Sequence, residues 1–113
     1  MRIQQSKIGD VTVSAIQEER IAADVAASLR EALVRQFQSG EKTIVLDLSA
    51  VKFIDSSGLS ALISVLKTVT GEGDLLLCGV TGAVATMFRL TRMDKVFRIF
   101  GTAEQGAAAV SRQ

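Results

Sequence analysis

The sequence contains no histidine, proline, tryptophan or tyrosine, and its single cysteine is Cys78. Without histidine, the chain alone cannot form a Ser-His-Asp or Cys-His catalytic group, a His-ligated zinc site or a phosphohistidine relay. One cysteine can build neither an internal disulfide nor a cysteine-rich metal site, and this usage fits a reducing compartment. We therefore expect no metal, no cofactor and no enzymatic activity of its own.

An excess of one charge sign is also missing, as are long apolar runs. Lys and Arg number 13 and Asp and Glu 12, which gives a net charge of +1 and argues against a protein that binds nucleic acid by neutralising phosphates. No apolar run of a signal peptide follows residues 1–5, and the longest apolar stretch, residues 75–80, is far short of the roughly 20 residues that span a bilayer. We expect a cytoplasmic protein without membrane insertion.

The 113 residues, 48% of them hydrophobic, are enough for a single domain, residues 1–113, with a buried core. The pattern predicts an N-terminal hairpin (3–8 and 11–16), buried strands (43–48 and 75–80), a short last strand (96–100) and helices over about 22–40, 56–71, 82–91 and 102–110, with 17–20 and 49–54 as connections. This alternation predicts an α/β fold with a mostly parallel sheet of about five strands, an antiparallel N-terminal strand and about four helices.

Residues 47–59 are the segment most able to carry a function. They follow the end of a central strand and open a helix, which is where open α/β sheets place their sites. Ser56 and Ser57 are two candidate phosphoacceptors there, because free N–H groups and the helix dipole can hold a phosphate. The same pattern is also typical of a simple helix cap, with Gly58 relieving crowding, and the residues alone favour the cap.

The stretch Asp-Leu-Ser-Ala-Val-Lys-Phe-Ile-Asp-Ser-Ser-Gly-Leu at 47–59 resembles the signature of the STAS (sulphate-transporter and anti-sigma-antagonist) domain family, and residues 82–97 resemble its third helix and following strand. The single-domain bacterial members are anti-sigma factor antagonists. The resemblance implies that the unphosphorylated protein binds an anti-sigma factor with serine kinase activity and so frees a sigma factor. It also implies that phosphorylation by this kinase releases the protein and that a metal-dependent serine phosphatase resets it.

The resemblance assigns the phosphorylated serine to Ser56, the first serine after Asp55. A helical wheel extended backward from the apolar residues 59, 62, 63 and 66 instead makes Ser57 the exposed serine, unless Ser56 is the N-cap and lies outside the helix. We take Ser56 as the site and keep Ser57 as the alternative. Together with Asp55 and Gly58, these serines form the expected partner-binding site.

The loop before the first helix departs from the family pattern. Members often carry Gly-x-Leu/Ile-Asp there, whereas this chain has Glu19-Arg20-Ile21-Ala22 and lacks both the glycine and the aspartate. Asp24, two positions later, is the candidate substitute in partner binding, with Glu19 as a second candidate.

Two other functions fit the length and the order of elements. An aspartyl-phosphate receiver could use Asp47, but it needs Mg²⁺ held by further carboxylates, and only Asp10, Glu18 and Glu19 follow the first strands. A STAS subunit that binds a lipid-transport ATPase without a phosphorylation cycle is the other alternative, and the intact serine pair argues against it.

Overall fold

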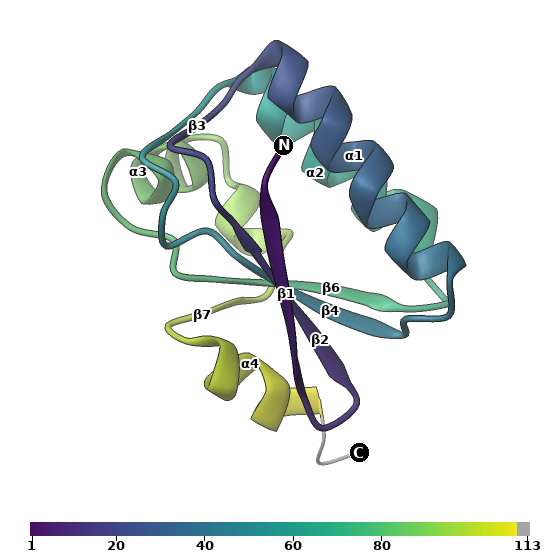
Figure 1. The fold of residues 1–113 in the computed structure, drawn as a ribbon. Helices are drawn as coiled ribbons and strands as arrows, with labels where there is room; N and C mark the ends of the chain where they lie inside the picture. Colours follow the sequence, from purple (N-terminus) through teal and green to yellow (C-terminus); the bar gives the residue numbers. More distant parts are fainter. Residues whose placement is uncertain (111–113) are drawn as a thin grey trace.

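The structure, a computed structural model that describes residues 1–110, has a five-stranded sheet between helices on both faces (Figure 1). The strands, in their order across the sheet, are β1 (Ile3–Ile8), β2 (Val11–Ile16), β4 (Thr43–Asp47), β6 (Asp74–Cys78) and β7 (Ile99–Phe100). β1 and β2 are antiparallel and the other neighbours are parallel. The predicted fold class is confirmed.

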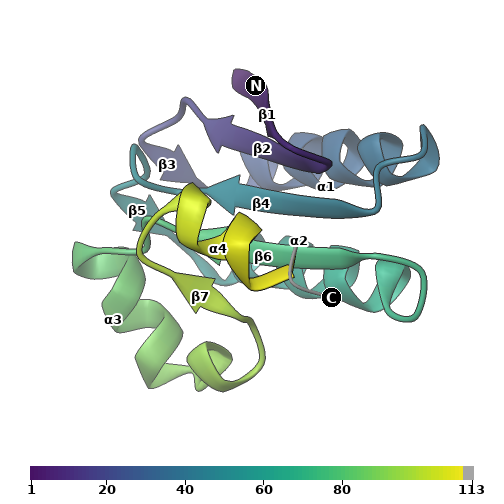
Figure 2. The ribbon, with the colours of Figure 1, turned by 90° about the horizontal axis from the view of Figure 1, so that it is seen from below.

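The helices α1 (Ala23–Gln38) and α2 (Ser56–Val69) lie side by side on one face of this sheet, α4 (Ala103–Val110) covers the other face, and α3 (Gly82–Leu90) lies beyond the β7 edge (Figure 2). Alternate residues of β4 enter the two cores: Ile44 and Leu46 pack under α1 and α2, and Val45 packs under α4. Burial on both faces explains the continuous apolar run. Among residues 1–110, no helix is both long enough and apolar enough to cross a membrane.

A second, two-stranded sheet was not predicted. β3 (Arg20–Ile21) and β5 (Phe53–Ile54) pair in parallel, with Arg20 opposite Phe53 and Ile21 opposite Ile54. The interpretation of both segments as connections is wrong, because a two-residue strand shows no periodicity. This small sheet joins the segment that enters α1 to the segment that enters α2.

The strand expected over 96–100 begins only at Ile99. Residues 93–95 instead form the 3₁₀ helix η1 (Met93–Lys95), and Met93 O accepts hydrogen bonds from the N–H groups of Val96 and Phe97. Phe97 is buried edge-on against Phe88, with ring centroids 5.9 Å apart, so this anchor holds the chain in a turn.

Side chains cap the closing helix at its start. Thr102 Oγ1 accepts from the N–H of Gln105 at 3.1 Å, and Gln105 Oε1 accepts from the N–H of Thr102 at 3.2 Å. This reciprocal pair is a capping box and satisfies two groups at the helix start.

Candidate functional site

Asp55 is the residue that caps α2. Its backbone is extended, and its Oδ1 accepts a hydrogen bond from the N–H of Gly58 at 3.0 Å. The first helical bond runs from Leu59 N–H to Asp55 O at 3.0 Å. Ser56 and Ser57 are therefore the first two residues of the helix, and the possibility that Ser56 is the N-cap is wrong.

The exposures of the two serines reverse the helical-wheel prediction, because Ser56 is exposed whereas Ser57 is half-buried. The prediction placed the centre of the buried side of α2 on the narrow face formed by residues 59, 62, 63 and 66. α2 packs on the sheet and also against α1, so its buried residues include Gly58, Ala61, Val65 and Val69. On the helix surface, Ser56 lies nearly opposite the centre of this wider buried face. The exposed first serine leaves its hydroxyl open to a partner.

Gly58 holds the helix close to the second sheet. A Cβ atom at Gly58 would lie 2.5 Å from Ile54 Cγ1 and 2.8 Å from the carbonyl oxygen of Ile21. Gly58 is itself buried, so its part in the expected partner-binding site is to let the start of α2 approach β3 and β5. The crowding interpretation of this glycine therefore has direct geometric support.

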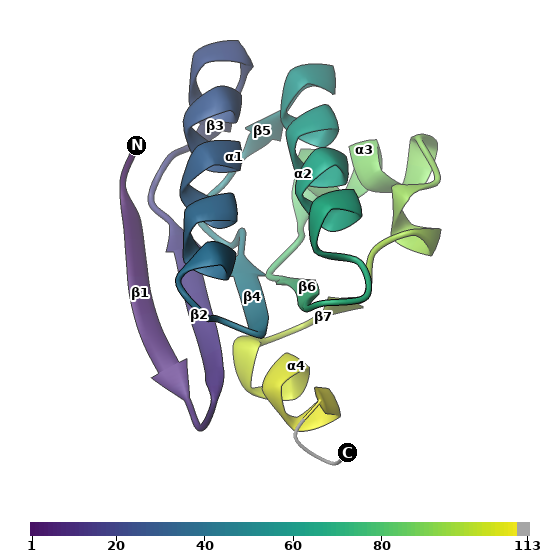
Figure 3. The same cartoon turned by 90° about the vertical axis from the view of Figure 1, so that its right-hand side faces the viewer.

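The start of α1 lies beside the start of α2 (Figure 3). Ala22 is the N-cap of α1 and makes no side-chain capping bond. Ala22 occupies the position at which the family pattern has aspartate. The aspartate that this chain lacks would therefore stand at the N-cap of α1. Asp24 is exposed and is the acidic residue of the first turn of α1. The carbonyl of Glu19 accepts from Lys52 and Phe53 N–H at 2.7 and 3.1 Å, which gives its backbone a structural role.

The second sheet carries an exposed cation–aromatic pair that was not predicted from the sequence. The Arg20 guanidinium lies 4.4 Å from the centroid of the Phe53 ring, and Phe53 is 36% exposed. Phe53 stands three residues before Ser56, within the signature. A large aromatic residue in that segment could have indicated a contact surface. Its partner Arg20 could not be predicted, because the two residues meet only through the pairing of β3 with β5.

The surroundings of Asp47 and Cys78 indicate structural roles for both residues. Asp47 Oδ1 accepts from the N–H of Ser49 at 3.0 Å and from its hydroxyl at 2.6 Å, so this carboxylate is engaged in hydrogen bonds at the end of β4. Cys78 is 1% exposed, and burial, with the nearby Asp47 carboxylate, raises the pKa of its thiol to about 12. Within residues 1–110, no three His, Cys, Asp or Glu side chains are grouped to hold a metal ion.

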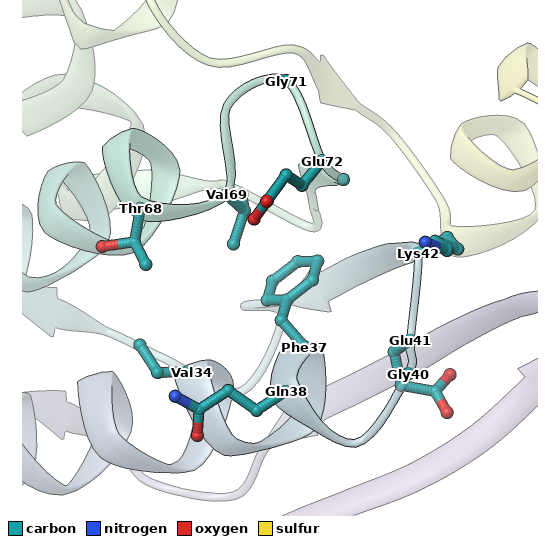
Figure 4. Close-up of a pocket in the computed structure, with 11 residues that line it drawn as sticks. Val34, Phe37, Gln38, Gly40, Glu41, Lys42, Thr68, Val69, Gly71 and Glu72 are labelled. Carbon is teal, nitrogen blue, oxygen red and sulfur yellow. The ribbon is translucent and has the colours of Figure 1, made fainter.

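A cavity of about 630 Å³ opens between the C-terminal ends of α1 and α2. Figure 4 shows the Phe37 ring in this cavity with Lys42 and Glu72 around it. It lies at the opposite end of these helices from Ser56 (Figure 3), and no predicted site residue lines it. This cavity is therefore separate from the candidate site at the helix starts.

The family model of the STAS domain matches residues 2–106. The chain belongs to the STAS domain family. The family suggested by the signature is thereby confirmed. A protein of Bordetella bronchiseptica that is named as an anti-sigma factor antagonist, BtrV, is 29% identical over 110 residues, which are 96% of this chain and 94% of that protein.

Solved structures share the STAS fold seen here. An anti-sigma factor antagonist from Mycobacterium paratuberculosis has a TM-score of 0.87 at 24% identity, over 97% of this chain and 93% of that one. The Bacillus protein SpoIIAA in its phosphorylated form has a TM-score of 0.69 at 16% identity, over 96% of this chain and 99% of that one.

Proposed function

We propose that this STAS protein is an anti-sigma factor antagonist controlled by phosphorylation of Ser56. The unphosphorylated form binds an anti-sigma factor that is also a serine kinase, and the captured partner releases its sigma factor. Phosphorylation separates the two proteins, and a serine phosphatase restores the binding form. The protein acts in the cytoplasm as a binding module and catalyses no reaction itself.

The observation that carries this proposal is the exposed hydroxyl of Ser56 in the first turn of α2. The Asp55 carboxylate already accepts from Gly58 N–H, and Ser57 is half-buried. Ser56 is therefore the serine that a kinase reaches without unwinding the helix. The kinase transfers the γ-phosphoryl group of its ATP to Ser56 Oγ, ADP leaves, and a base of the kinase takes the hydroxyl proton.

The electrostatics at this position favour release without a change of fold. A phosphate adds about −1.5 to −2 charges at neutral pH, and the start of a helix tolerates negative charge. A partner surface that fits a neutral hydroxyl must instead desolvate the phosphate next to Asp55. A like-charge contact near 4 Å costs on the order of 4 kcal/mol at an effective dielectric of 20. A loss of about 2.7 kcal/mol already weakens binding a hundredfold.

Phosphosite mapping tests the proposal. The protein is incubated with Mg-ATP and candidate anti-sigma factor kinases of its own organism, and phosphopeptides are sequenced by mass spectrometry. We expect label on Ser56, loss of label in Ser56→Ala and normal labelling in the matched control Ser57→Ala. Label on Ser57 alone would move the site by one residue. A complex that forms normally, gains no phosphate and is unaffected by ATP would contradict the switch and indicate a constitutive adaptor.

A further inference from the structure

The outer edge of β1 is open and regular. β1 is the first strand in the sheet order, with β2 on one side only, and Figure 3 shows no other element along its outer side. All six of its residues pair in register with β2, from Ile3 opposite Ile16 to Ile8 opposite Val11. The strand is therefore free of bulges, and among residues 1–110 one row of its backbone groups has no neighbouring strand.

The usual devices that protect an edge strand are missing here. Such strands are blunted by proline, bulges or unpaired charges, since open edges invite pairing with another chain. This chain has no proline, and the only charged residue of β1 is Lys7. Lys7 Nζ lies 2.7 Å from Glu41 Oε1, and this contact lowers the pKa of the Glu41 carboxyl, with a further contribution from the Thr12 hydroxyl. The ammonium group of Lys7 is thus paired with a carboxylate of its own chain.

The hydrogen-bonding phase of β1 identifies the free groups. Gln17 N–H donates to Arg2 O at 2.9 Å, so Arg2 belongs to a hydrogen-bonded pair. Hydrogen-bonded and non-hydrogen-bonded pairs alternate along an antiparallel ladder. Arg2 and the even-numbered residues of β1 therefore point their backbone groups at β2. Ile3, Gln5 and Lys7 point theirs outward.

We propose that a second copy of this chain pairs with the β1 edge, antiparallel and centred on Gln5. In this register Gln5 faces Gln5 of the second copy, and Ile3 faces Lys7 in both directions. Each of these pairs exchanges two backbone hydrogen bonds, because the outward N–H and C=O groups of one copy lie opposite those of the other. No like charges of β1 meet, and a net charge of +1 gives the two copies little mutual repulsion.

Self-pairing suits this edge because it closes the assembly. The β1 edges of the two copies pair with each other about a twofold axis, so neither remains free for a third copy. The result is a dimer and not a fibre. The opposite edge of the sheet is β7, which has only two residues, Ile99–Phe100. Ser56 lies at the start of α2 and not on β1, so this contact is separate from the proposed phosphorylation switch.

The test is sedimentation of the full chain from about 1 μM to about 1 mM, a range that covers weak to moderate dimers. We expect a concentration-dependent dimer. Gln5→Pro removes one outward N–H at the twofold axis, a change that edge strands tolerate, and should raise the dimer Kd at least tenfold. Gln5→Lys places two like charges opposite each other and should do the same. The matched control Gln4→Lys faces Ser6 of the second copy and should dimerise normally.

Hydrogen exchange provides a second readout. In the dimer, the amides of Ile3, Gln5 and Lys7 should become protected as the protein concentration rises, while those of Gln4 and Ser6 are protected throughout. A protein that is monomeric over the whole range, with fast exchange at the three outward amides, would overturn the proposal. So would a dimer that survives both Gln5 variants unchanged, since it would use another surface. Neither readout depends on a kinase.

Discussion

The backbone N–H of Asp55 donates to the carbonyl oxygen of Ile21 at 3.3 Å. This contact joins the residue that caps α2 to the last residue of β3, and so links two segments that are far apart in the chain. Because of it, the exposed Ser56 and the first turn of α1 belong to one surface.

Replacing Gly58 by alanine should destabilise the fold. The added Cβ would lie within 3 Å of Ile54 Cγ1 and of Ile21 O, so the backbone of α2 must move away from the second sheet. We expect a loss of about 1–3 kcal/mol in the free energy of unfolding, measured by urea denaturation. Ser60→Ala, at an exposed position of the same helix, is the control and should change stability by less than about 0.5 kcal/mol. Equal stabilities of both variants would show that Gly58 does not set this approach.

Ala22→Asp should stabilise the protein. Ala22 is the N-cap of α1 and makes no capping bond, so an aspartate there can accept from an N–H group of the first turn. The expected gain is about 1 kcal/mol. Ala23→Asp adds the same charge one residue later, without cap geometry, and should give a smaller gain. If thermal unfolding shows no difference between the two variants, the cap interpretation of this position is wrong.

Asp24→Ala should weaken binding of the kinase more than it weakens the fold. Asp24 is exposed in the first turn of α1, where its charge contributes about 0.3–1 kcal/mol through the helix dipole. We expect at least a tenfold rise in the Kd for the kinase by calorimetry. Glu31→Ala, an exposed acidic residue further along α1, is the control. A loss of stability with normal binding would leave Asp24 a structural role alone.

Cys78 should resist thiol reagents at pH 8 in the folded protein and react at once in urea. The pKa of its thiol rises from an ordinary value near 9.0 to about 12, mainly because it is buried. Between these values the unfolded chain loses the thiol proton and the folded chain keeps it, so stability falls as the pH rises above 9 and is independent of this group below. Rapid labelling of the native protein would contradict the buried assignment.

The features that the sequence predicts correctly are mostly local. The hairpin predicted over 3–8 and 11–16 forms as β1 and β2, with only the two residues Gly9 and Asp10 between the strands. The apolar run of β4 reflects burial on both faces, which is a property of the strand alone. Such patterns lie within a few residues of one another and need no knowledge of the tertiary fold.

The errors concern contacts between distant segments. β3 and β5 have two residues each, and they exist only because Arg20 and Ile21 meet Phe53 and Ile54. The helical wheel made the wrong serine the exposed one, because α1 buries a second side of α2. A wheel drawn from the sequence of α2 alone cannot include this contact between two helices. The site is therefore predictable as a segment, whereas the accessibility of each side chain in it depends on tertiary packing.

The most direct test of the account compares the affinities of two forms of the protein for the kinase. The unphosphorylated protein and the protein phosphorylated at Ser56 are titrated separately into the ADP-bound anti-sigma factor kinase, and circular dichroism verifies that both are folded. We predict binding at least about a hundredfold weaker for the phosphorylated form, equivalent to about 2.7 kcal/mol. Equal affinities of two folded forms would contradict the account, because Ser56 would then not be the switch.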